Sequence, residues 1–402
     1  MFIEVHMKKK SIFLLLVIYI TFIALGLPDA LLGSAWNLVR VDLNTSLGTL
    51  GIMTVMVYLM SIFATYNAPR LLRIFQTKYI TLTSVIFTGV ALILISQVNH
   101  FYQILFFAIP LGLGAGAIDV SLNHYLAAHY EAKHMNYLHS FYGIGVTAGP
   151  SIMAYTLSQN SWRMGYIIVG SLLLFIAFLL FLSLKLWAKE TDEHRQLHHP
   201  NIKTKDILKT KGAIYSIAIF VIYVHVESLA GVWIASYFYI VKEVDYATAA
   251  LFATSFYLAL TIGRLTSGFL STKITARKLI IIGSSLMILS SIFLWFKFEV
   301  IAIYFIIVFI LGLGAAPIYP NMMFLNGRVF SREKLSKIMS LQMGIGYLGF
   351  GLLTPAAGAL FQLTTIKIYP LIMMMMTVFL GFLIYQYIMK TKDVSIIKKD
   401  LI

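Results

Sequence analysis

The chain has 402 residues, of which 59% are hydrophobic and only 12% are charged, and it contains no cysteine. Soluble domains carry about 25% charged residues, so this composition excludes an ordinary soluble enzyme and is typical of a polytopic membrane protein. The net charge of +15 would suit a nucleic-acid-binding protein, but the basic residues are scattered over short segments, so we predict no nucleic-acid partner.

Apolar segments of about 20 residues, the length that crosses a bilayer, follow one another along the chain. They begin near Ser11, Ser46, Ile80, Phe101, Met135 and Met164, and after a polar gap near Gly212, Tyr246, Leu279, Ile301, Ile338 and Ile368. The first follows Lys8–Lys10 and lacks a small-residue cleavage site, so we interpret it as a transmembrane helix and not as a removed signal peptide. We therefore predict an all-α integral membrane protein of twelve transmembrane helices: an amino-terminal six-helix bundle at residues 1–187, a cytoplasmic linker at 188–211 and a carboxy-terminal six-helix bundle at 212–402.

The basic residues set the predicted orientation. With the amino terminus inside, the inner segments hold most of the 31 lysine and arginine residues. The outer segments hold Arg40, Arg163, Lys242, Lys297 and Lys367. Because inner loops are enriched in Lys and Arg, we predict a multi-pass protein of the cell membrane with both termini in the cytoplasm. The basic excess then reports topology, with some attraction to the anionic lipid bilayer.

The two halves repeat a pattern of small and acidic residues. Asp29 and Gly33 in the first segment correspond to Glu227 and Gly231 in the seventh, 198 residues later. The Gly-Leu-Gly run at 112–114 in the fourth segment corresponds to the run at 312–314 in the tenth, 200 residues later. Two correspondences at nearly one offset indicate duplication, and parallel six-helix halves are an architecture of secondary transporters.

Of the sixteen acidic residues, only Asp29, Asp119 and Glu227 lie well inside apolar segments. A carboxylate at membrane depth is costly and usually serves function, and a desolvated one takes up protons more readily. We therefore predict that these three residues couple transport to protons. The alternative is a carboxylate fixed by a hydrogen bond from another helix, and for Asp29, beside Pro28, the two interpretations are about equally weighted.

The stretch from Gly112 to Asn123 is the most informative of these segments. Its glycines let a neighbouring helix approach closely. Asp119 and Asn123 are four residues apart, so they share one helix face. A carboxylate and an amide on one face, inside an apolar segment, predict a transport site.

Sugar-like solutes need amides, hydrogen-bonding groups and flat aromatic faces. The predicted substrate-binding residues that offer these groups at or near membrane depth are Asn37, Asn123, His139, Tyr142, Trp233, Tyr257, Tyr319, Asn321 and Gln342. Aromatic residues make up 14% of the chain, so any one of them is more often a packing or lipid-facing residue. For His139 a hydrogen-bonded packing role is the more frequent outcome.

Other chemistries lack their motifs. The glycine run before Asp119 does not follow a strand, and no Walker pattern, nucleophile elbow or His-Glu-x-x-His zinc motif occurs. We therefore predict no enzyme activity and no cofactor. His194, His198 and His199 are either a metal-binding group or, as we favour, histidines of a polar linker, so we predict no metal site.

These motifs together resemble the major facilitator superfamily, and within it the fucose permease-like branch of sugar–proton symporters. The resemblance covers nearly the whole chain and rests on the stretches 26–37, 112–123, 141–150, 263–268 and 312–320. In fucose permease, acidic residues of the first and fourth helices handle the proton and the sugar, which implies these roles for Asp29 and Asp119. Glucose-type relatives carry an acidic residue in helix seven, where this chain has Glu227.

The resemblance also implies gating residues. The family's loop signature after helix two is degenerate here, since its aspartate is missing between Asn67 and Phe75, but Arg70 remains. Arg264 and Lys273 keep fragments of the matching loop after helix eight. Arg70 and Arg264 are therefore predicted to act in gating.

We predict a monomeric secondary transporter that carries a small-molecule substrate with protons, most simply a sugar symporter working by alternating access. The alternative is a proton-driven antiporter that exports a drug or a metabolite, because the run from Gly145 to Pro150 resembles part of an antiporter motif. A non-transporting receptor or scaffold would not need acidic residues inside the membrane.

Overall fold

The computed structural model describes residues 2–130, 132–187, 203–271 and 273–397, and within these ranges the regular structure is helical, without a strand. Eleven segments of the described chain are long and apolar enough to cross a membrane. The helix α6 (Ala132–Ser158) lies between two of them in sequence and has the length of a twelfth. The fold class predicted from the sequence, an all-α integral membrane protein, is confirmed.

Contacts divide the chain into two compact units. Unit 1 comprises Met1–Leu197 with Glu243–Thr254, and unit 2 comprises His198–Lys242 with Ser255–Ile402. The helices before the linker are α1 (Phe2–Gly26), α2 (Leu31–Asp42), α3 (Thr49–Ile74), α4 (Thr77–Ile95), α5 (Phe101–His129), α6, α7 (Trp162–Ser183) and η1 (Leu184–Leu186). The later helices are α8 (Thr204–Leu208), α9 (Ala213–Val241), α10 (Tyr246–Leu270), α11 (Ala276–Phe293), α12 (Ile301–Ala315), α13 (Ile318–Val329), α14 (Arg332–Leu363), η2 (Ile366–Ile368) and α15 (Tyr369–Ile397).

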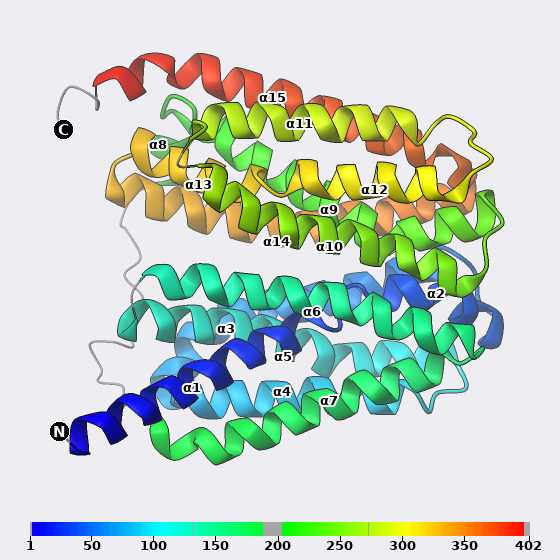
Figure 1. Ribbon diagram of the computed structural model, residues 1–402, viewed down its shortest axis with the longest axis horizontal. Helices are drawn as coiled ribbons and strands as arrows, with labels where there is room; N and C mark the ends of the chain where they lie inside the picture. Colours follow the sequence, from blue (N-terminus) through cyan, green and yellow to red (C-terminus); the bar gives the residue numbers. More distant parts are fainter. Residues whose placement is uncertain (1, 131, 188–202, 272, 398–402) are drawn as a thin grey trace. The chain divides into compact units, whose positions relative to one another are not determined.

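The same helix pairs pack together in each unit. In unit 1, α4 contacts α5 and α7, and α1 contacts α6. In unit 2, α11 contacts α12 and α15, and α9 contacts α14 (Figure 1). These pairings follow the order of the membrane-spanning segments in each half, so the repeat seen in the sequence is also a repeat in packing.

Glycines at matching positions bring these helices together. A Cβ on Gly112 of α5 would lie 2.2 Å from the carbonyl oxygen of Val57 on α3, and one on Gly312 of α12 would lie 2.3 Å from that of Phe256 on α10. Only glycine permits so close an approach of one backbone to another. Val57 and Phe256 are themselves separated in sequence by nearly the same interval as the two glycines. The predicted function of these glycines in close helix packing is confirmed, and their contact partners repeat with them.

A second glycine pair repeats in the same way. A Cβ on Gly114 would lie 2.8 Å from the carbonyl oxygen of Ser84 on α4, and one on Gly314 would lie 2.7 Å from that of Gly283 on α11. Ser84 and Gly283 again hold corresponding places in the two halves of the sequence. Helices α5 and α12 are thus each packed tightly between two neighbours, and the side chains they carry toward a site are held by a rigid backbone.

Two membrane-spanning segments are interrupted where the sequence predicts single helices. The first divides into α1 and α2 around Pro28, and the tenth divides into α12 and α13 at Pro317. Proline has no amide hydrogen and clashes with the preceding turn, so it ends one helix and is well tolerated where the next begins. The predicted linker 188–211 lies largely in residues 188–202, outside the described ranges, and so do His194, His198 and His199. Its described part contains α8, which packs against α9 and α14.

Candidate functional site

Asp29 lies at the break between α1 and α2, with its side chain exposed. The Tyr142 hydroxyl of α6 donates a hydrogen bond to Asp29 Oδ2. Glycines explain how the two helices come so close: a Cβ on Gly26 would lie 2.5 Å from the carbonyl oxygen of Tyr142, and one on Gly145 would lie 2.3 Å from that of Ile23. The structure therefore joins one predicted proton-coupling residue to one predicted substrate-binding residue.

Asp119 and Asn123 form a second pair on α5. The Asn123 side-chain amide donates to Asp119 Oδ1 at 2.8 Å and to the Asp119 carbonyl oxygen at 2.8 Å. The Asn123 side-chain oxygen is buried and has no hydrogen-bond partner among the described residues. An unmet buried acceptor costs about 1–3 kcal/mol, so a donor from a solute or from water would stabilise this pair.

The other predicted residues of unit 1 are Asn37, His139 and Arg70. Asn37 on α2 is 1% exposed, and its side-chain oxygen has no hydrogen-bond partner among the described residues. His139 on α6 has an exposed side chain whose ring meets the edge of Phe22 at 5.8 Å. Arg70 is exposed near the end of α3. The described contacts join neither Asn37 nor Arg70 to the two acidic pairs.

In unit 2, Glu227 of α9 pairs with Arg264 of α10. Arg264 Nη2 lies 3.5 Å from Glu227 Oε2, and the side chains are 23% and 14% exposed for Arg264 and Glu227 respectively. The same Nη2 donates to the hydroxyl of Tyr223, one turn before Glu227 on α9, at 3.1 Å. We call these three residues the arginine cluster. It lies within the helices, whereas the sequence pattern places Arg264 in a fragment of the loop that follows.

A hollow with about 220 Å³ of empty space lies beside this cluster in unit 2. Its lining residues are Ser216, Ile219, Phe220, Tyr223, Ile318, Tyr319, Met322, Met323 and Gln342. Two predicted substrate-binding residues, Tyr319 and Gln342, are thus brought together. Only about 10 Å³ of this space is open to the centre of a water-sized sphere, so in this conformation the hollow has room for about one water molecule and not for a sugar. We call it the unit 2 hollow.

One end of the unit 2 hollow is fixed by a buried polar network. Gln342 donates to the carbonyl oxygen of Ser216 at 2.9 Å and to its hydroxyl at 3.1 Å. The Ser216 hydroxyl donates to Asn326 Oδ1 at 2.9 Å, and Tyr387 donates to the same oxygen at 2.9 Å. These bonds tie α9, α13, α14 and α15 together, so the Gln342 amide is held in one orientation.

The remaining predicted residues of unit 2 have well-defined neighbours. Trp233 is fully buried and donates to the Thr354 carbonyl oxygen at 3.2 Å. Asn321 donates to the Ser267 hydroxyl at 3.0 Å and to the Pro317 carbonyl oxygen at 2.8 Å. A Cβ on Gly231 would lie 2.1 Å from the Tyr257 hydroxyl oxygen, so a side chain there would collide with Tyr257. Gly231 stands one turn after Glu227, so its missing side chain brings α10 close to the carboxylate.

Sequence reasoning missed Tyr223 and the pairing of Arg264 with Glu227. A tyrosine four residues before an acidic residue lies on the same face of a helix, and that spacing was the available signal. It was hidden because tyrosines are numerous, with 23 in the chain. The partner helix of Arg264 could not be known without the tertiary structure.

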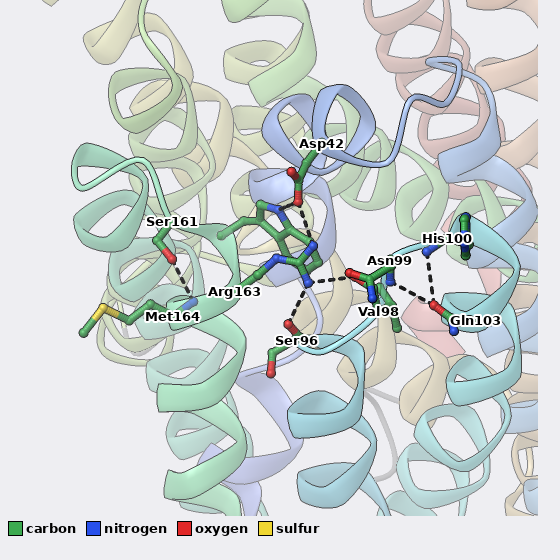
Figure 2. Close-up of polar contacts among 10 residues, drawn as sticks. Asp42, Ser96, Val98, Asn99, His100, Gln103, Ser161, Arg163 and Met164 are labelled. Carbon is green, nitrogen blue, oxygen red and sulfur yellow. Dashed lines mark hydrogen bonds and ion pairs between the residues drawn. The ribbon is translucent and has the colours of Figure 1, made fainter.

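Sequence reasoning also missed a polar clamp at the predicted outer end of unit 1, shown in Figure 2. Arg163 donates to Asp42 Oδ2 at 2.9 Å and to the carbonyl oxygens of Ser96 and Val98 at 2.9 and 2.7 Å. The Trp162 indole donates to the same Asp42 oxygen at 3.0 Å. The clamp joins the end of α2, the loop after α4 and the start of α7. Its signal in the sequence was an arginine among the few outer cations.

Within the described residues, no group of three or more His, Cys, Asp or Glu side chains is placed to hold a metal ion. The polar groups of the two acidic pairs and the arginine cluster are carboxylates, an amide, phenols and one guanidinium, which are suited to hydrogen bonding and proton exchange.

Comparisons with known proteins agree with this picture. A family model described as the Major Facilitator Superfamily matches residues 18–245 and again residues 228–400. Bypass of stop codon protein 6 of Saccharomyces cerevisiae is 22% identical over 314 residues, which cover 70% of this chain and 63% of that protein. Glucose/mannose transporter GlcP of Bacillus subtilis is 25% identical over 258 residues, which cover 61% of this chain and 62% of that protein. The chain therefore matches less than two thirds of the length of either relative.

Solved structures of similar shape include a D-xylose-proton symporter, with a TM-score of 0.77 at 12% identity, covering 95% of this chain and 99% of the other. The nucleoside transporter NupG has a TM-score of 0.74 at 12% identity, with 94% and 99% covered. A bacterial homologue of the human lysosomal transporter Spinster has a TM-score of 0.67 at 16% identity, with 95% and 96% covered. At these identities the likeness establishes the fold alone.

Proposed function

Because the chain belongs to the Major Facilitator Superfamily, a family of membrane carriers and not of enzymes, we propose that it is a proton-coupled symporter of a sugar or a similar small polar solute. The observation that supports this most is the Asp119–Asn123 pair. It places a carboxylate and an amide with an unmet acceptor inside a membrane-spanning helix. A carboxylate there exchanges a proton, and the amide oxygen accepts a bond from a solute hydroxyl.

The other acidic residues are proposed to share the coupling. Asp29 receives a bond from Tyr142, and Glu227 is paired with Arg264. Protonation removes the negative charge of a carboxylate, which lowers the cost of moving it through an apolar environment and favours reorientation of the carrier. Both termini are proposed to lie in the cytoplasm and the protein to act as a monomer in the cell membrane.

Two kinds of contact suit a sugar in this protein. Tyr319 and Phe220, whose ring centroids are 5.6 Å apart, are aromatic residues of the kind that packs against the C–H face of a sugar ring, and we propose that they meet the solute in a conformation in which the hollow is wider. Gln342 in the hollow and Asn123 on α5 present amides for its hydroxyl groups. The names of two relatives, a glucose/mannose transporter and a D-xylose-proton symporter, support the same solute class.

The exporter alternative rests on the glycines of α6. A Cβ on Gly145 would lie 2.3 Å from the Ile23 carbonyl oxygen, and one on Gly149 would lie 2.2 Å from that of Leu27. Close packing of α6 against α1 and Leu27 gives both glycines a structural role that either direction of transport would need.

The test is uptake into proteoliposomes containing the full chain. Labelled D-glucose, D-mannose and D-xylose are offered with and without an inward proton gradient, and internal pH is followed. Accumulation of a sugar together with internal acidification supports symport. Loss of protons from the vesicles when a lipophilic cation is added would instead identify an antiporter and refute the proposal.

A further inference from the structure

The arginine cluster has a geometry that the ion pair alone does not require. Arg264 Nη2 lies 3.5 Å from Glu227 Oε2 but 3.1 Å from the Tyr223 hydroxyl. Charge-assisted bonds between a guanidinium and a carboxylate usually measure about 2.7–2.9 Å. The guanidinium is thus nearer to the phenol than to the carboxylate, and the ion pair is looser than an unconstrained pair.

Tyr223 also connects this pair to the unit 2 hollow. Its side chain lines the hollow and is 3% exposed. On α9, Ser216, Phe220, Tyr223 and Glu227 follow one another at intervals of three and four residues, so they share one helix face. Ser216 and Tyr223 are then about 10 Å apart along the axis, which places the Gln342–Ser216 amide at one end of the hollow and the Tyr223 hydroxyl at the other.

We propose that Tyr223 is a positioning residue that holds Arg264 away from close contact with Glu227, so that Glu227 remains able to accept the transported proton. This rests on the proposed function, because it assigns a role within proton-coupled transport. A phenol has one proton to donate and two lone pairs. While Tyr223 accepts from Arg264, its own proton remains available to another acceptor.

The ionisable groups that contact α9 between Phe220 and Gly231 come from several helices. They are Arg264 and Tyr257 of α10, Tyr319 of α13, Tyr369 of α15, which donates to the Leu229 carbonyl oxygen at 3.5 Å, and Tyr223 and His225 of α9 itself. Helix α14 faces this part of α9 with Thr354, whose hydroxyl bonds that of Ser228 at 2.6 Å. Arg264 is the one permanent cation in this set, so its distance from Glu227 dominates the electrostatics.

The test compares the full-length protein with Tyr223→Phe and Tyr237→Phe in proteoliposomes. Tyr237 is the matched control, because it lies on the same helix, is 2% exposed and donates its hydroxyl to the Leu294 carbonyl oxygen at 3.2 Å, outside the hollow. The initial rate of uptake of the sugar that the natural protein accumulates best is measured across external pH. Glu227→Gln and the double variant Tyr223→Phe/Glu227→Gln are included to show that the shift acts through this carboxylate.

In Tyr223→Phe the guanidinium loses its phenol and closes on Glu227, so the pH of half-maximal uptake is expected to fall by about 1 unit, which corresponds to 1.36 kcal/mol. Tyr237→Phe is expected to keep the natural profile, and adding Tyr223→Phe to Glu227→Gln is expected to cause no further shift. An unchanged or raised midpoint in Tyr223→Phe would overturn the proposal, as would the same downward shift in the Glu227→Gln background. If the natural protein accumulates none of the three sugars, the proposed function fails, and that result is distinct from an unshifted variant of an active carrier.

Discussion

Asp29 of unit 1 and Glu227 of unit 2 hold corresponding positions in the two halves of the sequence, but different groups bind them. A phenol from α6 donates to Asp29, whereas a guanidinium from α10 pairs with Glu227. By contrast, the glycine contacts of α5 and α12 are nearly identical in the two units. Duplication has therefore kept the positions where backbones touch and has changed the polar side chains, which is expected if packing fixes the carrier and the polar groups fix what it carries.

The largest effect is expected for Asp119, the acidic residue of unit 1 with no acidic counterpart, since Tyr319 stands at the equivalent place in unit 2. Asp119→Asn should lower proton-driven accumulation to the level reached without a gradient, a loss of about 100-fold at the upper end of usual coupling energies. The measurement is sugar uptake at a fixed pH gradient. Asp206→Asn, at an exposed position of α8, is the control, and full accumulation by Asp119→Asn would remove Asp119 from the coupling role.

The next effect sharpens the contrast between the two acid partners. Arg264→Met leaves Glu227 charged and partly buried, so it should destabilise the protein by about 3 kcal/mol. Adding Glu227→Gln should restore most of that loss. Tyr142→Phe in unit 1 removes one hydrogen bond to a carboxylate and should cost only about 1.5 kcal/mol. The thermal unfolding midpoints of the natural protein and the three variants are compared in detergent. Equal losses of stability in Arg264→Met and Tyr142→Phe would show that the two acidic residues do not differ in how strongly they depend on their partners.

The shared scaffold is tested at its glycines. Gly112→Ala and Gly312→Ala each place a Cβ within 2.3 Å of a carbonyl oxygen, so each should lower stability by about 1–3 kcal/mol, and by similar amounts. Gly344→Ala, where no atom lies within 4 Å of the new Cβ, is the control and should be neutral or slightly stabilising. A large loss for one glycine and none for its counterpart would contradict the repeat in packing.

The smallest effect concerns the polar clamp of unit 1. In unit 2 the position that corresponds to Asp42 is Lys242, at the end of α9. Lys242 there donates to the Tyr304 hydroxyl at 2.7 Å. An ammonium cannot reproduce the fork with which Arg163 binds Asp42 and two carbonyl oxygens. Arg163→Lys should therefore cost about 1 kcal/mol, since the pair is 33% and 44% exposed. The readout is again thermal unfolding, and an unchanged midpoint would mean that the clamp adds no stability.

The fold could be predicted from the sequence because each membrane-spanning helix is recognised by a run of about 20 apolar residues. It also located the acidic residues at membrane depth, since charges are rare in such runs. The division of the tenth segment at Pro317 was not foreseen, because a proline can kink a helix, end it or begin the next one. The pairing of Arg264 with Glu227 depends on which helices pack against each other, and the local sequence pattern does not predict helix packing partners.

The division at Pro317 has a mechanical consequence. Its missing amide hydrogen leaves a gap in the ladder of backbone hydrogen bonds, so bending there is cheap. The segment before it, α12, is anchored through Gly312 and Gly314, while α13 beyond it carries Tyr319 and Met322 of the hollow wall. The tenth span is therefore an anchored helix, α12, followed by a helix, α13, that can bend at Pro317. A small rotation of α13 would widen or close the unit 2 hollow beside Tyr223 while α12 keeps its place.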